Sequence, residues 1–311
     1  MRLTDPLTWH EIIKQEQSSI EQRGKSMATE KRLFFLGAGS IAEAMIKGIV
    51  GARVVPAEQI VVSNRKNGAR LEELRRSYGV RVCGDKLAEV ARAEVVVLAM
   101  KPFDVMQALQ EVRGALSERQ LVVSVVAGVA TRAIEGQVEG VRVPVIRAMP
   151  NTSSFVQESA TAISRGRWAS VSHVEFVMTM FSAIGSVTVV EERLLDAVTG
   201  LSGTGPAYFY YVVESLMRAG QDLGLPEETC WELLVQTMYG AAKMLRETGK
   251  GPEELRRQVT SPNGTTMAGI SVLEQGGFPA LVQRAVERAT ERAAEMGREV
   301  SGAVNHGDDL P

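Results

Sequence analysis

The sequence predicts a doubly wound parallel α/β sheet followed by an all-α domain. Short apolar runs, most of them rich in Val and Ile, alternate with amphipathic helical patterns from about residue 31 to residue 190. A glycine-rich loop follows the first of these runs, and helices that begin at prolines replace the apolar runs after residue 190. We therefore expect a dinucleotide-binding domain over 31–190 and a helical dimerisation and substrate-binding domain over 191–300. Residues 1–30 are expected to be a disordered or loosely helical extension rather than a functional arm, and 301–311 a tail.

The predicted strands are apolar on both faces. They are expected at Leu33–Leu36, Ile60–Val62, Val95–Ala99, Leu121–Val125 and Val143–Ile146. Helical patterns lie between them, for example over Ala69–Tyr78. Strands of this kind are typical of a parallel sheet that helices cover on both sides.

The loop Gly37-Ala38-Gly39-Ser40-Ile41-Ala42 joins the first strand to an amphipathic helix. In this context a G-x-G-x-x-A pattern predicts a Rossmann-type site for a dinucleotide. Gly37 permits the tight turn, Gly39 permits close approach of the pyrophosphate, and Ala42 permits close packing of helix on strand. The predicted cofactor contacts from this loop are Gly37, Gly39, Ser40 and Ile41.

The second strand ends in Ser63-Asn64-Arg65-Lys66. An NAD site usually has an acidic residue here, which binds the ribose 2′-hydroxyl. Amide, hydroxyl and cationic groups suit the 2′-phosphate of NADP instead. Asn64 and Arg65 are therefore predicted to bind NADPH, with NADH as the alternative cofactor. The other interpretation is that these cations are exposed residues of a turn.

Two further segments follow strands at the same edge of the sheet, where such folds bind ligands. Ala99, Lys101 and Pro102 are predicted to lie beside the nicotinamide or the substrate, although Lys101 could equally be a solvated strand-end lysine. Asn151 follows the predicted strand at Val143–Ile146 and either satisfies an amide of the cofactor or caps a turn.

In the C-terminal third, the spacing of apolar residues predicts helices with strongly apolar faces. One such face consists of Tyr208, Val212, Leu216, Ala219 and Leu223. These faces are too apolar for a small bundle to cover alone, so we expect burial against a second copy of the chain. The expected helices span 191–199, 206–223, 226–248, 252–259, 266–275 and 279–297.

Two hydroxyl- and glycine-rich turns precede predicted helices in this region, at Leu201–Tyr208 and Ser261–Thr266. A helix N-terminus with free N–H groups and nearby hydroxyls suits a small carboxylate. One loop for a dinucleotide and another for a small acid indicate a reductase.

Composition is consistent with this interpretation. The chain has 311 residues and is 45% hydrophobic, which allows two cores. With 35 Lys and Arg against 37 Asp and Glu, its net charge of −2 does not indicate a nucleic acid or membrane partner. No apolar run is long enough for a membrane helix, and the first thirty residues lack the apolar region of a signal peptide, so we expect a cytoplasmic enzyme. The histidines lie outside every motif, which argues against zinc or histidine acid–base chemistry.

Taken together, these motifs resemble those of pyrroline-5-carboxylate reductases. The resemblance covers about residues 31 to 297, in order and with compatible spacing, and its C-terminal motifs are more specific than the glycine loop. The motifs that carry it are 37–42, 64–65, 101–102, 149–152, 202–208, 261–266 and 272–278.

The resemblance implies reduction of the cyclic imine Δ1-pyrroline-5-carboxylate to L-proline with NADPH or NADH, the last step of proline biosynthesis. It also implies a Rossmann domain, a helical dimerisation domain and a homodimer that in this family often assembles further into decamers. Ser261 and the backbone of Gly264, Thr265 and Thr266 would bind the substrate carboxylate. The Thr266 hydroxyl would lie near the ring nitrogen and act as the catalytic group.

One departure from the family pattern concerns the substrate loop. Asn263 stands where the family usually has glycine, so the loop must reach its conformation with an Asn, which tolerates the left-handed region better than most residues. A related reductase of another cyclic imino acid therefore remains an alternative, as does a non-catalytic nucleotide-binding relative.

Overall fold

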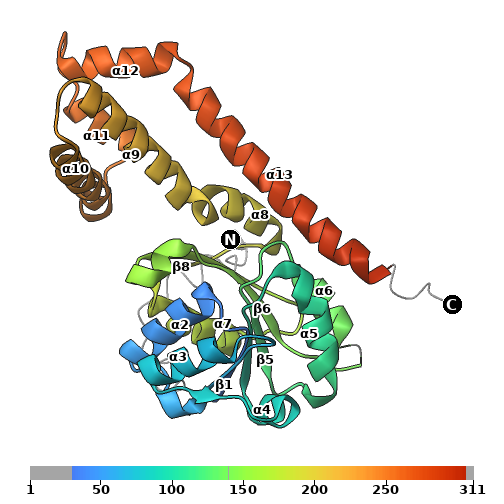
Figure 1. Cartoon of the computed structure of the whole chain (residues 1–311). Coiled ribbons are helices and arrows are strands. Elements are labelled where there is room, and N and C mark those ends of the chain that lie inside the picture. Colours follow the sequence, from blue (N-terminus) through green and yellow to red (C-terminus); the bar gives the residue numbers. More distant parts are fainter. Residues whose placement is uncertain (1–29, 139, 306–311) are drawn as a thin grey trace, which may run out of the picture. The chain divides into compact units, whose positions relative to one another are not determined.

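The computed structural model describes residues 30–138 and 140–305, and the first part of the chain forms an eight-stranded sheet (Figure 1). The strand order is β3-β2-β1-β4-β5-β6-β7-β8. The order reverses between β1 and β4, which is the doubly wound arrangement predicted from sequence. The strands are β1 Leu33–Leu36, β2 Ile60–Ser63, β3 Arg81–Val82, β4 Val95–Leu98, β5 Leu121–Ser124, β6 Val145–Met149, β7 Ser159–Arg165 and β8 Gly185–Val189.

Strands β1 to β6 are parallel, as predicted, but the sheet does not end there. β7 pairs antiparallel with β6, and β8 pairs parallel with β7. The sequence patterns predict neither of these last two strands. β7 consists largely of small and polar residues, whereas the predicted strands are continuous apolar runs. The chain reverses between β6 and β7 within a short segment, which only an antiparallel pair allows.

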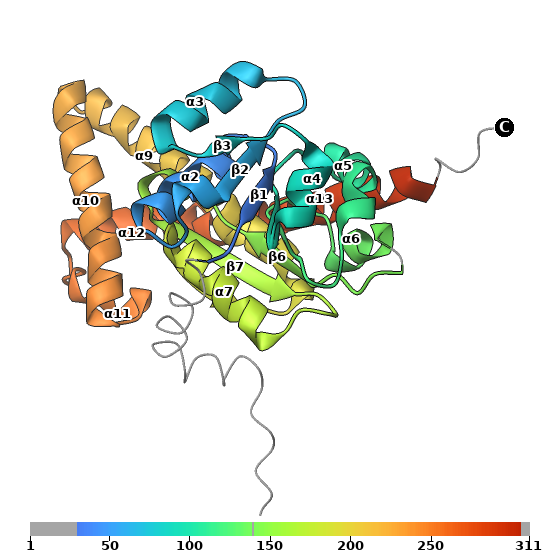
Figure 2. The same ribbon diagram turned by 90° about the horizontal axis from the view of Figure 1, so that it is seen from below.

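Helices cover both faces of the sheet (Figures 1 and 2). Side chains alternate along each strand, so Leu33 and Phe35 belong to one core while Phe34 and Leu36 belong to the other. The first core is covered by α2 (Ser40–Gly51), α3 (Gly68–Tyr78) and α7 (Val171–Ser182). The second is covered by α4 (Lys86–Arg92), α5 (Val105–Val112) and α6 (Thr131–Gln137). The short 3-10 turns are η1 (Ala57–Gln59), η2 (Pro102–Asp104), η3 (Arg113–Ala115), η4 (Thr152–Val156) and η5 (Glu192–Leu194).

The helices of the C-terminal third agree closely with the predicted ones, and no strand follows β8 in the part of the chain that the structure describes. Each begins within about two residues of the predicted start. The exception is the segment after residue 190, which forms η5, the four-residue α8 and the π-helical turn η6 rather than one helix. The elements are α8 Leu195–Val198, η6 Thr199–Gly203, α9 Gly205–Asp222, α10 Glu227–Thr248, α11 Pro252–Gln258, α12 Thr265–Gln275 and α13 Phe278–Asn305.

The chain divides into two compact units, and the division differs from the boundary expected at residue 190. The first unit contains the described residues up to Gly203 together with those from Ala289 onward, and the second is Thr204–Arg288. The segment after residue 190 stays with the sheet because buried Arg147 of β6 pairs with Asp196 at 3.1 Å. Glu192 accepts hydrogen bonds from the backbone and hydroxyl of Thr131, both 2.7 Å long, at the start of α6.

Two expectations concern residues outside the described ranges. The extension expected over 1–30 lies there almost entirely, as does the end of the tail expected over 301–311, although α13 continues to Asn305. Within the described residues, the helices are too short or too polar for any of them to span a membrane.

Candidate functional site

The glycine loop makes a tight turn directly after β1. Gly37 has φ +111°, and a Cβ at this position would lie 2.1 Å from the carbonyl oxygen of Ala99 at the end of β4. The turn therefore requires glycine here. Gly39 is the N-cap of α2, and a Cβ there would meet no atom within 4 Å. The N-terminus of α2 is thus open on the side that an anion would approach.

The end of β2 carries polar groups beside this loop. The Asn64 side-chain oxygen accepts from the backbone N–H groups of Lys66 and Asn67, both at 3.1 Å, which folds the turn. The Arg65 guanidinium is 52% exposed and donates to the Gln107 side chain at 2.9 Å. It also lies 3.7 Å from the Asp104 carboxylate. Arg65 is therefore held over the sheet edge by weak, exposed partners.

These segments line one cavity of about 780 Å³. An open glycine loop, a helix N-terminus and a cationic turn around one cavity fit a phosphorylated dinucleotide. The cavity brings together the predicted cofactor residues Gly37, Gly39, Ser40, Ile41, Asn64, Arg65, Ala99, Lys101 and Pro102.

Asn151 does not line this cavity. Its side-chain oxygen accepts from the N–H of Ser153 at 3.1 Å and caps η4, and its amide nitrogen donates to the carbonyl of Ser202 at 3.1 Å. Of the two roles predicted for Asn151, the structure shows the capping one.

The residues on the side of the cavity that faces Arg65 were not predicted from the sequence. Asp104, Ala108 and Glu111 line it from η2 and α5, and Lys86 lines it from the start of α4. The spacing of 104, 108 and 111 places them on one helical face. That face is detectable in the sequence, but its position opposite β2 depends on the strand order.

The predicted carboxylate site lies in the second unit, at the start of α12. Gly264 is the N-cap of this helix and has no side chain to cap it. The Ser261 hydroxyl lies close by, since a Cβ on Gly264 would be 2.3 Å from its oxygen. Thr266 is the second helical residue and does not occupy the cap position. Asn263 has φ +58°, so it takes the left-handed conformation considered for it above.

Comparisons with known proteins cover both units. The family model described as pyrroline-5-carboxylate reductase dimerisation matches residues 192–296. The model described as NADP oxidoreductase coenzyme F420-dependent matches residues 32–128. Pyrroline-5-carboxylate reductase 2 of Bacillus subtilis is 41% identical over 273 residues, 88% of this chain and 98% of the relative. The chain belongs to the pyrroline-5-carboxylate reductase family.

Similar proteins of this family also occur in plants, and solved structures of family members have a fold similar to that of this chain. The pyrroline-5-carboxylate reductase of Arabidopsis thaliana is 38% identical over 81% of this chain and 90% of its own length. The Coxiella burnetii enzyme structure is 34% identical with a TM-score of 0.80, covering 86% of this chain and 98% of that one. The Plasmodium falciparum structure with NADP bound is 26% identical with a TM-score of 0.76 and the same coverage.

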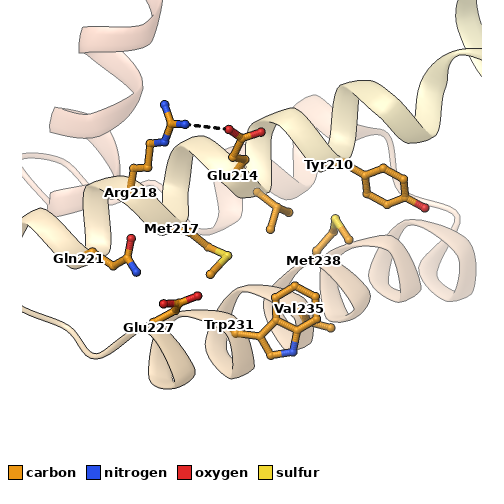
Figure 3. Close-up of a pocket in the computed structure, with 10 residues that line it drawn as sticks. Tyr210, Glu214, Met217, Arg218, Gln221, Glu227, Trp231, Val235 and Met238 are labelled. Carbon is orange, nitrogen blue, oxygen red and sulfur yellow. Dashed lines mark hydrogen bonds and ion pairs between the residues drawn. The ribbon is translucent and has the colours of Figure 1, made fainter.

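The second unit has the apolar surface expected of a dimerisation domain in the pyrroline-5-carboxylate reductase family. A cavity of about 650 Å³ lies between α9 and α10, with Tyr210 and Met217 on one helix and Trp231 and Met238 on the other (Figure 3). Arg218 and Glu214 also line it and form an ion pair at 3.0 Å. Large apolar side chains are exposed elsewhere on these two helices, including Phe209, Tyr211, Leu216 and Leu233.

Proposed function

We propose that this protein reduces Δ1-pyrroline-5-carboxylate to L-proline with NADPH. The observation that carries the proposal is the similarity to pyrroline-5-carboxylate reductases over 88% of the chain. The family models include both the glycine loop and the Ser261–Thr266 turn.

The cofactor is proposed to bind in the cavity of the first unit. Backbone N–H groups of the loop from Gly37 to Ile41 bind the pyrophosphate, assisted by the N-terminus of α2. Asn64 and Arg65 bind the 2′-phosphate, so NADPH is preferred over NADH. Ala99, Lys101 and Pro102 border the nicotinamide end. Bound NADPH supplies the hydride that adds to the carbon of the C=N bond.

The imine is proposed to bind at the start of α12. The Ser261 hydroxyl and the N–H groups of Gly264, Thr265 and Thr266 bind its carboxylate, where the uncapped helix end favours negative charge. The Thr266 hydroxyl hydrogen-bonds the ring nitrogen and holds its proton as the C=N bond is reduced. A protonated cyclic imine is already a strong hydride acceptor, so binding and orientation are the main tasks of the protein.

The direct test is oxidation of NADPH by the purified protein in the presence of the five-membered cyclic imine, with L-proline identified as the product. A second candidate is a reductase of a six-membered cyclic imino acid, because Asn263 replaces the usual glycine of the substrate loop. Comparing kcat/KM for the two ring sizes separates these candidates.

The assembly proposed is a homodimer formed through the second unit, with a decamer built from such dimers as the larger alternative. The support is the exposed apolar surface on α9 and α10. Leaving this much apolar surface in water is unfavourable, and a second copy covers it. We also propose that the enzyme acts in the cytoplasm, where its cofactor and other biosynthetic enzymes occur.

A further inference from the structure

The glycine loop is supported from outside the cofactor cavity by one side chain of α3. The Arg70 Nε donates to the carbonyl oxygen of Ala38 at 3.2 Å. Ala38 lies between the two glycines of the loop and lines the cavity, whereas Arg70 does not. Only 19% of the Arg70 side chain is exposed, so this contact is partly shielded from water.

The same guanidinium also binds two carboxylates. Arg70 donates to Glu43 of α2 and, over 2.7 Å, to Glu73 of its own helix. The Tyr78 hydroxyl donates to the other oxygen of Glu43 at 3.0 Å. Arg70 thus joins α3, the loop and the first turn of α2 through hydrogen bonds that engage both ends of its planar guanidinium.

Without its hydrogen-bond partners, the negative charge of Glu43 would oppose binding of the cofactor's pyrophosphate. It lies in the first turn of the helix whose N-terminus is proposed to bind the pyrophosphate. Burial acts to raise the pKa of Glu43, but hydrogen bonds from Arg70 and Tyr78 outweigh it and hold that pKa below the ordinary value. The carboxylate is therefore ionised at neutral pH, and without its partners it would repel a bound anion.

The contact with Ala38 acts on the loop itself. A peptide group is planar, so fixing the carbonyl of Ala38 also fixes the direction of the Gly39 N–H. Gly39 is the N-cap of α2 and has no side chain with which to hold its conformation. The direction of the loop's N–H groups therefore depends on contacts from neighbouring residues.

We propose that Arg70 is a positioning residue for the cofactor, which fixes the peptide between Ala38 and Gly39 and neutralises Glu43 so that the loop binds pyrophosphate. This inference rests on the dinucleotide site assigned above and adds to it a residue that touches no cofactor. Because NADPH and NADH share the pyrophosphate, Arg70 affects the two cofactors equally.

The test is the Kd of the apo protein for NADPH and for NADH, measured by titration calorimetry without the imine. Arg70→Leu keeps much of the side-chain volume and removes all donors, so both Kd values should rise about 10-fold, by the same factor. Arg70→Lys keeps the charge and should recover part of the loss. Tyr78→Phe removes one hydrogen bond to Glu43 and should raise both Kd values by a smaller factor. Arg75→Leu is the matched control on α3, since the exposed Arg75 forms its ion pair with Glu72 of the same helix, and its Kd values should be unchanged.

The outcomes separate this inference from the function on which it rests. A wild-type protein that binds neither cofactor overturns the proposed dinucleotide site. Wild-type binding with unchanged Kd values in folded Arg70→Leu and Tyr78→Phe overturns the inference alone. A rise for NADPH without a rise for NADH also overturns it, because Arg70 would then act on the 2′-phosphate. If Arg70→Leu does not fold, an unchanged Kd in both Arg70→Lys and Tyr78→Phe overturns it.

Discussion

At the scale of single residues, the proposed preference for NADPH rests on the exposed end of β2. Arg65 donates a hydrogen bond there to Gln107 of α5 and lies near Asp104 of η2. Such exposed contacts contribute little free energy, whereas an arginine–phosphate contact is strong and directional. Arg65 is therefore free to exchange its partners for a 2′-phosphate.

We predict that Arg65→Ala raises the KM for NADPH and leaves that for NADH unchanged. The lost charge-assisted hydrogen bond should cost about 1.5–3 kcal/mol. Steady-state kinetics with each cofactor measure this. Arg76→Ala, an exposed arginine of α3 paired with Glu72, is the control and should change neither KM. Equal changes for both cofactors in Arg65→Ala would show that Arg65 has only a structural role.

The hydroxyls of Ser261 and Thr266 should affect different kinetic constants. If Thr266 meets the ring nitrogen as the hydride adds, Thr266→Val lowers kcat more than it raises the KM for the imine, since an interaction made in the transition state acts on kcat. Ser261→Ala should mainly raise KM, because the carboxylate is remote from the reacting bond. Each change should cost roughly 1–3 kcal/mol. A folded Thr266→Val enzyme with unchanged kcat would contradict the catalytic role.

At the scale of elements, the C-terminal half of α13 packs within the first unit through a pair of glycines. A Cβ on Gly297 would lie 2.3 Å from the carbonyl oxygen of Gly128, in the loop between β5 and α6. Val300, one turn further along α13, is buried in the second core. Backbone touches backbone at this point, so no side chain can move aside to relieve a clash.

We predict that Gly297→Ala lowers the free energy of unfolding by about 1–3 kcal/mol, because the helix must move away from the loop. Gly136→Ala is the matched control, since Gly136 is an exposed helical residue of α6 with no atom within 4 Å of an added Cβ. It should stabilise the protein by up to about 1 kcal/mol through helix propensity. Thermal or denaturant unfolding of both variants measures the difference. Similar stabilisation by the two substitutions would show that the glycine contact does not matter.

The sequence predicted the elements whose signals are local and left out those set by long-range contacts. The apolar runs of β1, β2, β4 and β5 and the turn at Gly37 are determined by neighbouring residues, so pattern alone located them. β7 lacks such a run and exists as a strand because β6 and β8 lie beside it. Arg70 and Ala38 are far apart in the chain, and only the packing of α3 beside the loop brings them together. Asp104 and Arg65 are likewise distant in the chain and are brought together only by the packing of the fold.

At the scale of the whole molecule, the apolar surface of α9 and α10 should hold two copies together. Trp231 lines the cavity between these helices and is 56% exposed. Trp231→Glu should weaken the dimer by about 2 kcal/mol or more, as loss of a central aromatic anchor usually does. Sedimentation velocity at micromolar concentration measures this. Leu87→Glu, at a similarly exposed leucine of α4, is the control and should leave the mass unchanged. A wild-type protein that sediments as a stable monomer would contradict the proposed assembly.

The activity proposed for this protein is the reduction of a five-membered cyclic imine with NADPH. The most direct measurement is the rate of NADPH oxidation by the purified protein with Δ1-pyrroline-5-carboxylate, beside a six-membered cyclic imino acid. We predict rapid oxidation with the five-membered ring, L-proline as the product, and a much lower kcat/KM for the larger ring. A protein that binds NADPH tightly but oxidises it with neither imine would contradict the claim and indicate a non-catalytic nucleotide-binding relative.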